Sequence, residues 1–479
     1  MNRRDARAVL AAVLGTLVAC DRAPASDANT RESILLVSID TLRADSVGTY
    51  GSARPTPVLD ALARESIVFR NAYAPAPWTI PSHASLFTGL APRALGVNGR
   101  TAIPDAAPML AEALAGAGYA TGARVNTTYV GSKYGFDRGM DEFSLHPDRK
   151  DVAQGVDAAL EFARRMRGRP SFFFLHVFDV HGPYTAPAPW TDRYVSDALP
   201  PDDALPFLRR LAYQRHLREL PQATGVAWVR ARYDAGVARV DAELERLFEG
   251  LRAAGAWDDT WVFVTSDHGE AFYEHRVWIG HGLFLYEPEL RVPLIVKPPA
   301  RVAGGRAIDV PVSLIDLGPT MRAIAGLEPD SAAQGRSLRP VLEGEASLPA
   351  DHAVFGDSPH LGDAGFVRVG RWKYVEDARA SVEPVLRNHL KPEPDVRDEL
   401  RARLDLGPKL FDLETDPAET SNRIDDHPDV AARLAARLAA RQAESDAIRA
   451  RLRARTARPP PVDLTPDEKR QLRELGYGE

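Results

Sequence analysis

The sequence predicts an α/β fold in which a mostly parallel sheet is sandwiched by helices. Three apolar runs carry this prediction: Ser33–Ile39, Ser171–Val177 and Thr260–Thr265. Nearly continuous apolar runs of this length are typical of strands buried on both faces of a parallel sheet. A long amphipathic pattern, roughly Ala223–Gly250, places apolar residues at three- and four-residue spacing and predicts a helix between the second and third runs.

The remaining elements follow in chain order. Helical patterns occur at Thr56–Glu65, Pro108–Ala117 and Ala153–Arg167, and short strands are expected at Ser66–Phe69, Tyr119–Val125 and Val292–Lys297. The glycines of Gly131–Phe143 do not follow a nucleotide-binding pattern, so this stretch is expected to be a loop. The Pro-rich stretch Trp190–Gln222 is expected to form an excursion over the mouth of the site.

The character of the chain changes after about Pro349. We therefore expect a catalytic domain over residues 33–348 and a smaller α+β subdomain over residues 349–479. In this subdomain a small antiparallel sheet is predicted, with strands at Ala353–Gly356, Gly365–Val369 and Trp372–Val375. Two helices are predicted after it, at Pro428–Arg455 and Pro466–Leu475.

Composition limits the classes of function. The 479 residues are 44% hydrophobic and 26% charged, with a net charge of −6, as in an ordinary soluble globular protein. A nucleic-acid partner is not expected, because binding to a phosphate backbone requires a basic excess. An acidic total still allows a small anionic substrate, since a local metal ion can reverse the sign of the potential in one cleft.

The N-terminus has the features of a targeting segment. Three arginines precede the apolar run Ala8–Ala19, which is too short to span a bilayer and suits the core of a signal peptide over residues 1–19. Its end resembles the lipobox of bacterial lipoproteins, which implies lipidation of Cys20, a tether over residues 20–32 and a place in the bacterial cell envelope. Asp21 resembles the signal for retention on the periplasmic side of the inner membrane. The alternative is a secreted protein in which this single cysteine has no role.

The segment Trp78–Gly89 is the centre of the predicted site. Pro81 suits the first turn of a helix, which places Thr79 at or just before a helix N-terminus. Unpaired N–H groups and the positive end of the helix dipole would hold a tetrahedral oxyanion beside the Thr79 hydroxyl. The alternative is that Thr79 only caps the helix, which is a common role for threonine.

Each of the three apolar runs is followed by side chains that can bind a metal. Asp40 follows the first, Asp179 and His181 the second, and Asp267 and His268 the third. Ligands collect beyond the carboxyl ends of the strands in open α/β sheets. A separate helix cap could explain any one of these endings, but all three together predict one polar site.

Three further polar residues lie near the same predicted edge. His281 precedes the strand at Val292–Lys297 and can reach this edge, and Asn126 ends the strand at Tyr119–Val125 and is a candidate substrate contact. His176 lies inside an apolar run, so it is interpreted as a core histidine.

These motifs together resemble the sulfatase family of the alkaline phosphatase superfamily. The resemblance spans about residues 33–479 without the 190–222 excursion. It rests on Ser33–Gly51, the Thr79–Gly89 pattern, His181–Tyr184, Asp267–Glu270, Leu285–Ile295 and Leu410–Glu419 with Asn422. It implies an alkaline-phosphatase-like fold, with a mixed, mostly parallel sheet between helices and a smaller C-terminal α+β subdomain.

Two departures from the family bear on the chemistry. At the position of Thr79, sulfatases carry Cys or Ser, which is oxidised to formylglycine. At the position of His83 they usually carry Arg, and His83 is expected to bind substrate in this chain. A threonine cannot form the aldehyde, so an ester on Thr79 must be cleaved by water at the transferred centre. Phosphorus accepts such an attack when a metal neutralises charge, so a threonine-nucleophile variant that favours phosphoryl transfer is predicted.

The resemblance implies one divalent cation held by Asp40, Thr79, Asp267 and His268. Oxygen and imidazole donors favour Zn²⁺ or Mn²⁺, with Ca²⁺ or Mg²⁺ as alternatives. Thr41 stands where many sulfatases have a second carboxylate, which argues against a four-carboxylate Ca²⁺ site. A two-metal alternative takes Asp179, His181 and His281 for a second ion. Otherwise His181 and His281 are expected to contact the transferred group or protonate the leaving group.

Three classes of function follow from this interpretation. The first is a hydrolase of phosphate or sulfate esters that acts on a small-molecule, glycan or lipid ester. The second is a transferase that moves a phospho-group within the cell envelope. The third is a non-catalytic binding protein that has kept the sulfatase-like fold.

Overall fold

The computed structural model describes residues 31–146, 151–195, 222–275, 279–390, 397–455 and 462–474. The predicted signal peptide, Cys20 and most of the predicted excursion lie outside these residues. Of the excursion, the structure describes residues 190–195, which include α6 (Trp190–Tyr194), and Gln222, the first residue of α8 (Gln222–Ala253). Within the described ranges, no helix is both long enough and apolar enough to span a bilayer.

The main sheet has nine strands in the order β10-β2-β9-β6-β1-β5-β3-β4, with β11 beside β2. Only the pairs made by β9 are antiparallel, so the sheet is mixed and mostly parallel, as predicted. The strands are β1 (Ser33–Ile39), β2 (Ile67–Tyr73), β3 (Ala120–Val125), β4 (Glu142–Leu145), β5 (Ser171–Val177), β6 (Thr260–Thr265), β9 (Arg291–Lys297), β10 (Arg306–Ile308) and β11 (Val312–Ser313).

The three strands predicted from apolar runs form the centre of this sheet. β1 lies between β5 and β6 and is parallel to both. Ile39 pairs with Val177, and Ser38 pairs with Thr265. Because the strands end in register, the residues that follow them emerge at one edge of the sheet.

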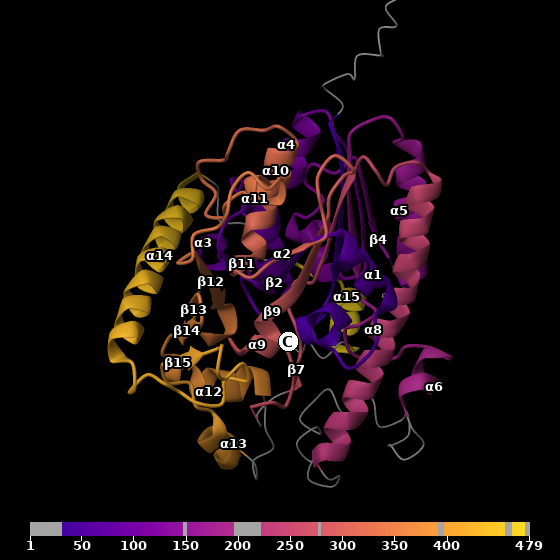
Figure 1. The fold of residues 1–479 in the computed structure, drawn as a ribbon. Helices are drawn as coiled ribbons and strands as arrows, with labels where there is room; N and C mark the ends of the chain where they lie inside the picture. Colours follow the sequence, from indigo (N-terminus) through magenta and orange to yellow (C-terminus); the bar gives the residue numbers. More distant parts are fainter. Residues whose placement is uncertain are drawn as a thin grey trace, which may run out of the picture.

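Helices cover both faces of the sheet. Alternate β1 residues point to opposite sides, with Leu36 in the core cluster beneath α2 and Val37 in the core cluster beneath α8. Figure 1 shows α5 and α8 side by side along one flank of the sheet. The helices are α1 (Pro57–Glu65), α5 (Val152–Arg165) and α8 (Gln222–Ala253) on one face, and α2 (Thr79–Thr88), α4 (Leu110–Gly116) and α10 (Leu317–Ile324) on the other.

A second, antiparallel sheet lies in the C-terminal part of the chain. Its strands are β12 (Ala353–Ser358), β13 (Ala364–Val369), β14 (Trp372–Val375) and β15 (Lys409–Asp412), of which β15 was not predicted. The long helix α14 (Pro428–Arg455) packs Leu434 and Leu438 with Val367 of β13 and forms one side of the molecule (Figure 1). A short helix, α15 (Pro466–Glu474), follows it.

Two small elements complete the surroundings of the site. The hairpin β7 (Ala271–Phe272) and β8 (Ile279–Gly280) follows β6, and α9 (Glu287–Leu290) precedes β9. The predicted loop Gly131–Phe143 differs from expectation at its end, where β4 begins at Glu142 and pairs with β3. This edge strand is short and partly exposed, so its sequence has no apolar run.

Candidate active site

Thr79 lies at the first position of α2, the helix that the Thr79 segment predicts. The residue before it, Trp78, occupies the N-cap in an extended conformation, and its side chain makes no capping hydrogen bond. Thr79 is fully buried, and its Oγ1 lies 3.2 Å from Nε2 of His268. The hydroxyl therefore faces the ends of the strands, and the alternative in which it only caps the helix is wrong.

Asp40 and Asp267 bring two carboxylates to the same place from β1 and β6. One ligand atom of each lies within 4.8 Å of the others in a group formed with His268, and all three residues are buried. Oδ1 of Asp40 and Oδ2 of Asp267 are buried and make no hydrogen bond with the described part of the chain. Buried carboxylate oxygens are costly without a partner, so this arrangement calls for a positive charge.

The pKa values of the two carboxyl groups shift in opposite directions. Burial and the charge of Asp267 raise the pKa of Asp40 well above its usual value. Burial would also raise the pKa of Asp267, but nearby His268 and His83 outweigh it and lower that pKa. Ionisation of one carboxyl group thus opposes ionisation of the other, and a divalent cation would offset this repulsion.

The orientation of His268 leaves a ring nitrogen facing Thr79. Its Nδ1 lies 2.9 Å from the carbonyl oxygen of Gly269. A carbonyl only accepts hydrogen bonds, so Nδ1 carries the proton and Nε2 of the neutral ring has a lone pair. Asp40, Asp267 and His268 therefore offer two carboxylates and an imidazole nitrogen with Thr79 beside them, a donor set that fits a divalent cation.

His83 and His176 form a second buried group with Asp267. Nδ1 of His83 lies 3.0 Å from the carbonyl oxygen of Thr79, and its Nε2 lies 3.0 Å from Oγ of Ser38. Burial lowers the pKa of both histidines to about 4, so they are neutral at pH 7. His83 is thus a hydrogen-bond donor to the backbone of the residue predicted as nucleophile.

His176 does more than fill the core. Its Nδ1 accepts a hydrogen bond from the backbone N–H of Asn126 at 3.4 Å, so Nε2 carries the proton and donates to Oδ2 of Asp40 at 3.2 Å. The interpretation as a core histidine is correct for its burial but misses this contact. Because its proton faces Asp40, His176 orients a candidate metal ligand and is not suited to bind a cation itself.

His181 and His281 lie next to this cluster. The ring centroid of His281 is 4.4 Å from that of His268 and 4.9 Å from that of His181. His181 stacks on Phe178 at 4.1 Å, and Nδ1 of His281 lies 3.0 Å from Oε1 of buried Glu270. Sequence reasoning assigned no role to Glu270, although it directly follows Asp267, His268 and Gly269 in the motif.

The two-metal alternative does not fit the position of Asp179. Its Oδ1 forms an ion pair with Arg239 of α8 at 2.9 Å and accepts the backbone N–H of Val152. Among the described residues, Asp179, His181 and His281 do not form a group that could hold a metal ion. The sequence could not show that an arginine 60 residues away meets this carboxylate.

Asn126 lies where the sequence places it, at the end of β3. The residue is 1% exposed, and its Nδ2 makes no hydrogen bond within the ranges that the structure describes. Its backbone N–H donates to His176, so the side-chain amide is the part of Asn126 whose N–H groups have no partner among the described residues.

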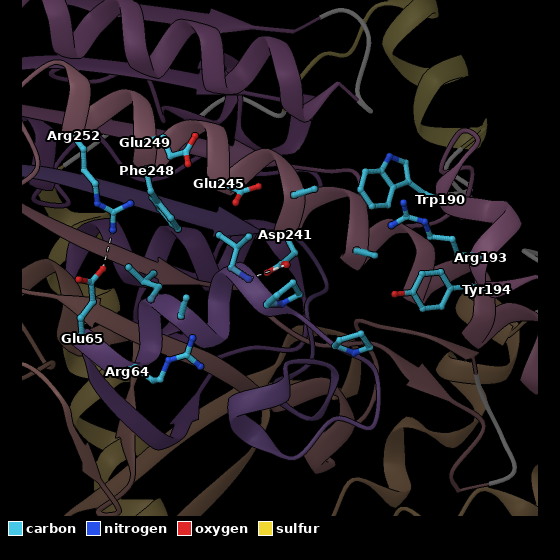
Figure 2. Close-up of a pocket in the computed structure, with 17 residues that line it drawn as sticks. Arg64, Glu65, Trp190, Arg193, Tyr194, Asp241, Glu245, Phe248, Glu249 and Arg252 are labelled. Atoms are coloured by element: carbon cyan, nitrogen blue, oxygen red, sulfur yellow. Dashed lines mark hydrogen bonds and ion pairs between the residues drawn. The ribbon is translucent and has the colours of Figure 1, made fainter.

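A cavity lies elsewhere, between α1, α6 and α8 (Figure 2). Its volume is about 690 Å³, and it is lined by Trp190, Tyr194, Phe248 and several charged side chains. In Figure 2, Arg252 pairs with Glu65 across one end of it. The described residues that line this cavity include none of the predicted site residues, so it is separate from the Thr79 cluster.

Comparison with known proteins decides the family. The sulfatase family matches residues 32–327, which is more than half of the chain. The chain belongs to the sulfatase family. It is therefore a sulfatase-family ester hydrolase, and its buried His/Asp cluster is consistent with the metal site typical of sulfatases.

Two curated relatives show how far the similarity extends. The chain is 26% identical over 461 residues to the uncharacterised sulfatase YidJ of Escherichia coli (strain K12), covering 83% of this chain and 84% of that protein. It is 27% identical over 411 residues to the multifunctional alkaline phosphatase superfamily protein PehA of Trinickia caryophylli, covering 66% and 78%.

Solved structures share the fold. A phosphonate monoester hydrolase of Agrobacterium radiobacter aligns with a TM-score of 0.66 at 23% identity, covering 87% of this chain and 96% of that one. A protein solved in complex with its substrate D-glucosamine-2-N,6-O-disulfate aligns with a TM-score of 0.68 at 21% identity, covering 87% and 99%. At these identities the likeness establishes the alkaline-phosphatase-like fold of the sulfatase family.

Proposed function

We propose that this sulfatase-family enzyme hydrolyses phosphate esters through Thr79, with one divalent cation held by Asp40, Thr79, Asp267 and His268. The observation that carries the proposal is the position of the Thr79 hydroxyl. It lies at the start of α2, 3.2 Å from Nε2 of His268 and beside two buried carboxylates, each with an oxygen that makes no hydrogen bond to a described residue.

The hydroxyl of Thr79 loses its proton to solvent and its oxygen attacks the transferred phosphorus. The bond from phosphorus to the leaving oxygen breaks, the alcohol departs, and a threonine ester remains. The N-terminus of α2 and its dipole favour negative charge at this oxygen and on the phosphoryl group. A bound divalent cation supplies the positive charge that offsets both carboxylates and the charge of the transferred group. His83 and His176 keep Thr79 and Asp40 in position by hydrogen bonds.

Water then cleaves the ester and restores the threonine. His281 is suited to accept a proton from this water. Its Nδ1–H donates a hydrogen bond to Glu270, so Nε2 is the acceptor nitrogen of the neutral ring. His181, whose Nδ1 donates to the carbonyl oxygen of Gly182, contacts the leaving group. Asn126 and His83 are assigned to substrate and nucleophile positioning.

Phosphoryl transfer is preferred to sulfuryl transfer because Thr79 cannot form an aldehyde. An ester on threonine has no route of release except attack at phosphorus or sulfur, and phosphorus accepts that attack more readily. The similarity to a phosphonate monoester hydrolase and to a multifunctional alkaline phosphatase superfamily protein supports this preference. The mixed oxygen and imidazole donors favour Zn²⁺ or Mn²⁺ over Ca²⁺ or Mg²⁺.

The enzyme is further proposed to act in a bacterial cell envelope, anchored by lipid on Cys20 at the periplasmic side of the inner membrane. The support is the sequence alone, namely the signal-peptide pattern of residues 1–19 and the polar stretch that follows. Its substrate would be a small-molecule, glycan or lipid ester within reach of that membrane.

The test is a substrate panel on protein lacking residues 1–20. After removal of metals with a chelator, aryl phosphate monoesters, diesters and phosphonates are compared with aryl sulfates in Zn²⁺, Mn²⁺, Mg²⁺ and Ca²⁺. We expect phosphorus esters to be cleaved with kcat/KM at least about 100-fold above sulfates, and activity to return with Zn²⁺ or Mn²⁺.

Variants of the nucleophile complete the test. Thr79→Ala should lower kcat at least about 1000-fold, because it removes the attacking oxygen. Thr79→Ser keeps that oxygen and should retain activity. Full activity of Thr79→Ala, or faster cleavage of sulfates, would overturn the proposal, and transfer to an added alcohol in place of water would identify a transferase.

A further inference from the structure

The residue after Asp40 adopts a backbone conformation that is rare for its type. Thr41 has φ +62°, in the left-handed region, where a β-branched side chain is a genuine outlier. The turn is closed by a hydrogen bond from the N–H of Leu42 to the carbonyl oxygen of Ile39. Asp40 and Thr41 are its two central residues, so the strained residue adjoins a candidate metal ligand.

Strain of this kind persists only where the surroundings enforce it. Oγ1 of Thr41 donates to the carbonyl oxygen of Asp40 at 2.7 Å, a contact within the turn itself. The N–H of Thr41 makes only a long contact, 3.4 Å, with Oδ1 of Asp267. The first of these hydrogen bonds is internal to the turn and the second reaches the residues that follow β6, so neither connects the turn to a helix.

Tyr233 provides the connection from α8. Its hydroxyl donates to the carbonyl oxygen of Thr41 at 2.9 Å and accepts the backbone N–H of Arg43 at 2.9 Å. The side chain is fully buried and packs on Phe272 of β7, with ring centroids 4.9 Å apart. One hydroxyl therefore binds the backbone on both sides of Leu42, and a rigid 32-residue helix holds it there.

We propose that Tyr233 is a positioning residue that clamps the Asp40 turn in its strained conformation and so sets the affinity of the site for its cation. The inference rests on the proposed role of Asp40. Without the hydroxyl, Thr41 relaxes toward an ordinary φ, and the carboxylate of Asp40 leaves its place beside Asp267 and His268. Tyr233 itself touches neither substrate nor metal.

The chain offers a matched control in Tyr50. Its hydroxyl likewise donates to a carbonyl oxygen and accepts a backbone N–H, both of Leu294, at 3.0 and 2.8 Å. Tyr50→Phe and Tyr233→Phe thus remove the same two kinds of contact, but only the second affects the Asp40 turn. A loss of stability common to both variants measures the general cost of removing such a bridge.

The experiment measures Zn²⁺ affinity of the metal-free protein by competition with a chelating dye, together with melting temperature. We expect Tyr233→Phe to weaken Zn²⁺ binding at least about tenfold and Tyr50→Phe to leave it within about twofold. Glycine adopts positive φ without strain, so in a Thr41→Gly background Tyr233→Phe should weaken binding less than about threefold.

Two results would overturn the inference. One is a Tyr233→Phe protein that binds Zn²⁺ as tightly as the wild type. The other is an equal loss of affinity on Tyr233→Phe with and without the Thr41→Gly substitution, which shows that the hydroxyl does not act through the strained turn. A separate comparison tests the proposed function. If Asp40→Asn binds Zn²⁺ as tightly as the wild type, Asp40 is not a metal ligand, so the proposed function fails and the inference fails with it.

Discussion

At the scale of single residues, the candidate site is built from side chains whose protons are placed by their neighbours. Carbonyl oxygens accept the Nδ1 protons of His83, His181 and His268, and Glu270 accepts that of His281. Each neutral ring then has Nε2 as its acceptor nitrogen. Side chains that orient a reacting group in this way matter nearly as much as the group itself.

Glu270 offers the clearest test at this scale. Glu270→Ala removes the acceptor for Nδ1 of His281, so the imidazole loses both its orientation and its fixed proton position. We expect kcat to fall about 10- to 100-fold with little change in KM. Glu270→Gln keeps an acceptor oxygen and should recover most of the loss. Steady-state kinetics on an aryl phosphate measures this, and equal rates for wild type and Glu270→Ala would contradict it.

At the scale of elements, contacts between helices depend on buried polar groups. Asp241 of α8 is 2% exposed and accepts the backbone N–H groups of Val58 and Leu59 at 3.1 and 2.8 Å, at the first turn of α1. The N-cap residue of α1, Thr56, makes no capping hydrogen bond with its side chain. A carboxylate from another helix therefore takes the place of a cap.

This contact should make stability depend on pH. Burial, opposed by the two N–H groups, raises the pKa of Asp241 from 3.8 to about 6. Because its pKa is raised on folding, Asp241 makes its full contribution to stability below its pKa in the unfolded chain. This contribution is lost as pH rises through its pKa in the folded protein, and it amounts to about 1.4 kcal/mol for each unit by which the two pKa values differ. We therefore compare the melting temperatures of the wild type and of Asp241→Asn. The difference between them, wild type minus variant, should fall as pH rises from the pKa of Asp241 in the unfolded chain to its pKa in the folded protein. A constant difference would contradict this.

The sequence predicts the strands of the main sheet well, because β1, β5 and β6 are buried on both faces and read as apolar runs. It misses β4, β10 and β11 of that sheet, the pair β7 and β8, and β15, which are all two to four residues long, and β4 is also partly exposed. The meeting of Asp40, Thr79, Asp267 and His268 is predictable, since parallel strands end at one edge. The contact of His176 with Asp40 is not, because a buried histidine has the same pattern whether it fills space or orients a ligand.

Contacts between residues far apart in the chain cannot be predicted from the sequence pattern. Arg239 and Tyr233 both lie on α8, whose pattern shows only an apolar stripe, yet one neutralises Asp179 and the other bridges the Asp40 turn. Each contact depends on how α8 crosses the sheet, which no local pattern records. The positive φ of Thr41 is hidden for the same reason, since threonine is a poor residue for that conformation.

At the scale of the whole molecule, a buried ionic network joins the C-terminal sheet to the main one. Nζ of Lys373 on β14, whose side chain is fully buried, lies 2.8 Å from Glu419 and 3.0 Å from Glu287 of α9. Tyr73 of β2 donates to Glu287 at 2.7 Å. In the same short helix, Glu289 accepts the N–H groups of the segment that follows His281. The two sheets and the site are thus connected through α9.

Lys373→Met tests this connection. The substitution keeps an apolar stem but removes the cation nearest to Glu287 and to buried Glu419, and leaves only Arg368, 3.9 Å from Glu287. Removing one partner of a buried ion pair typically costs about 3–5 kcal/mol. We expect the free energy of unfolding in urea to fall by that amount. Arg437→Ala is the control, because its pair with Asp351 is at the surface, 4.0 Å long, and should be worth less than about 1 kcal/mol. Similar losses for both variants would show that the buried network does not hold the sheets together.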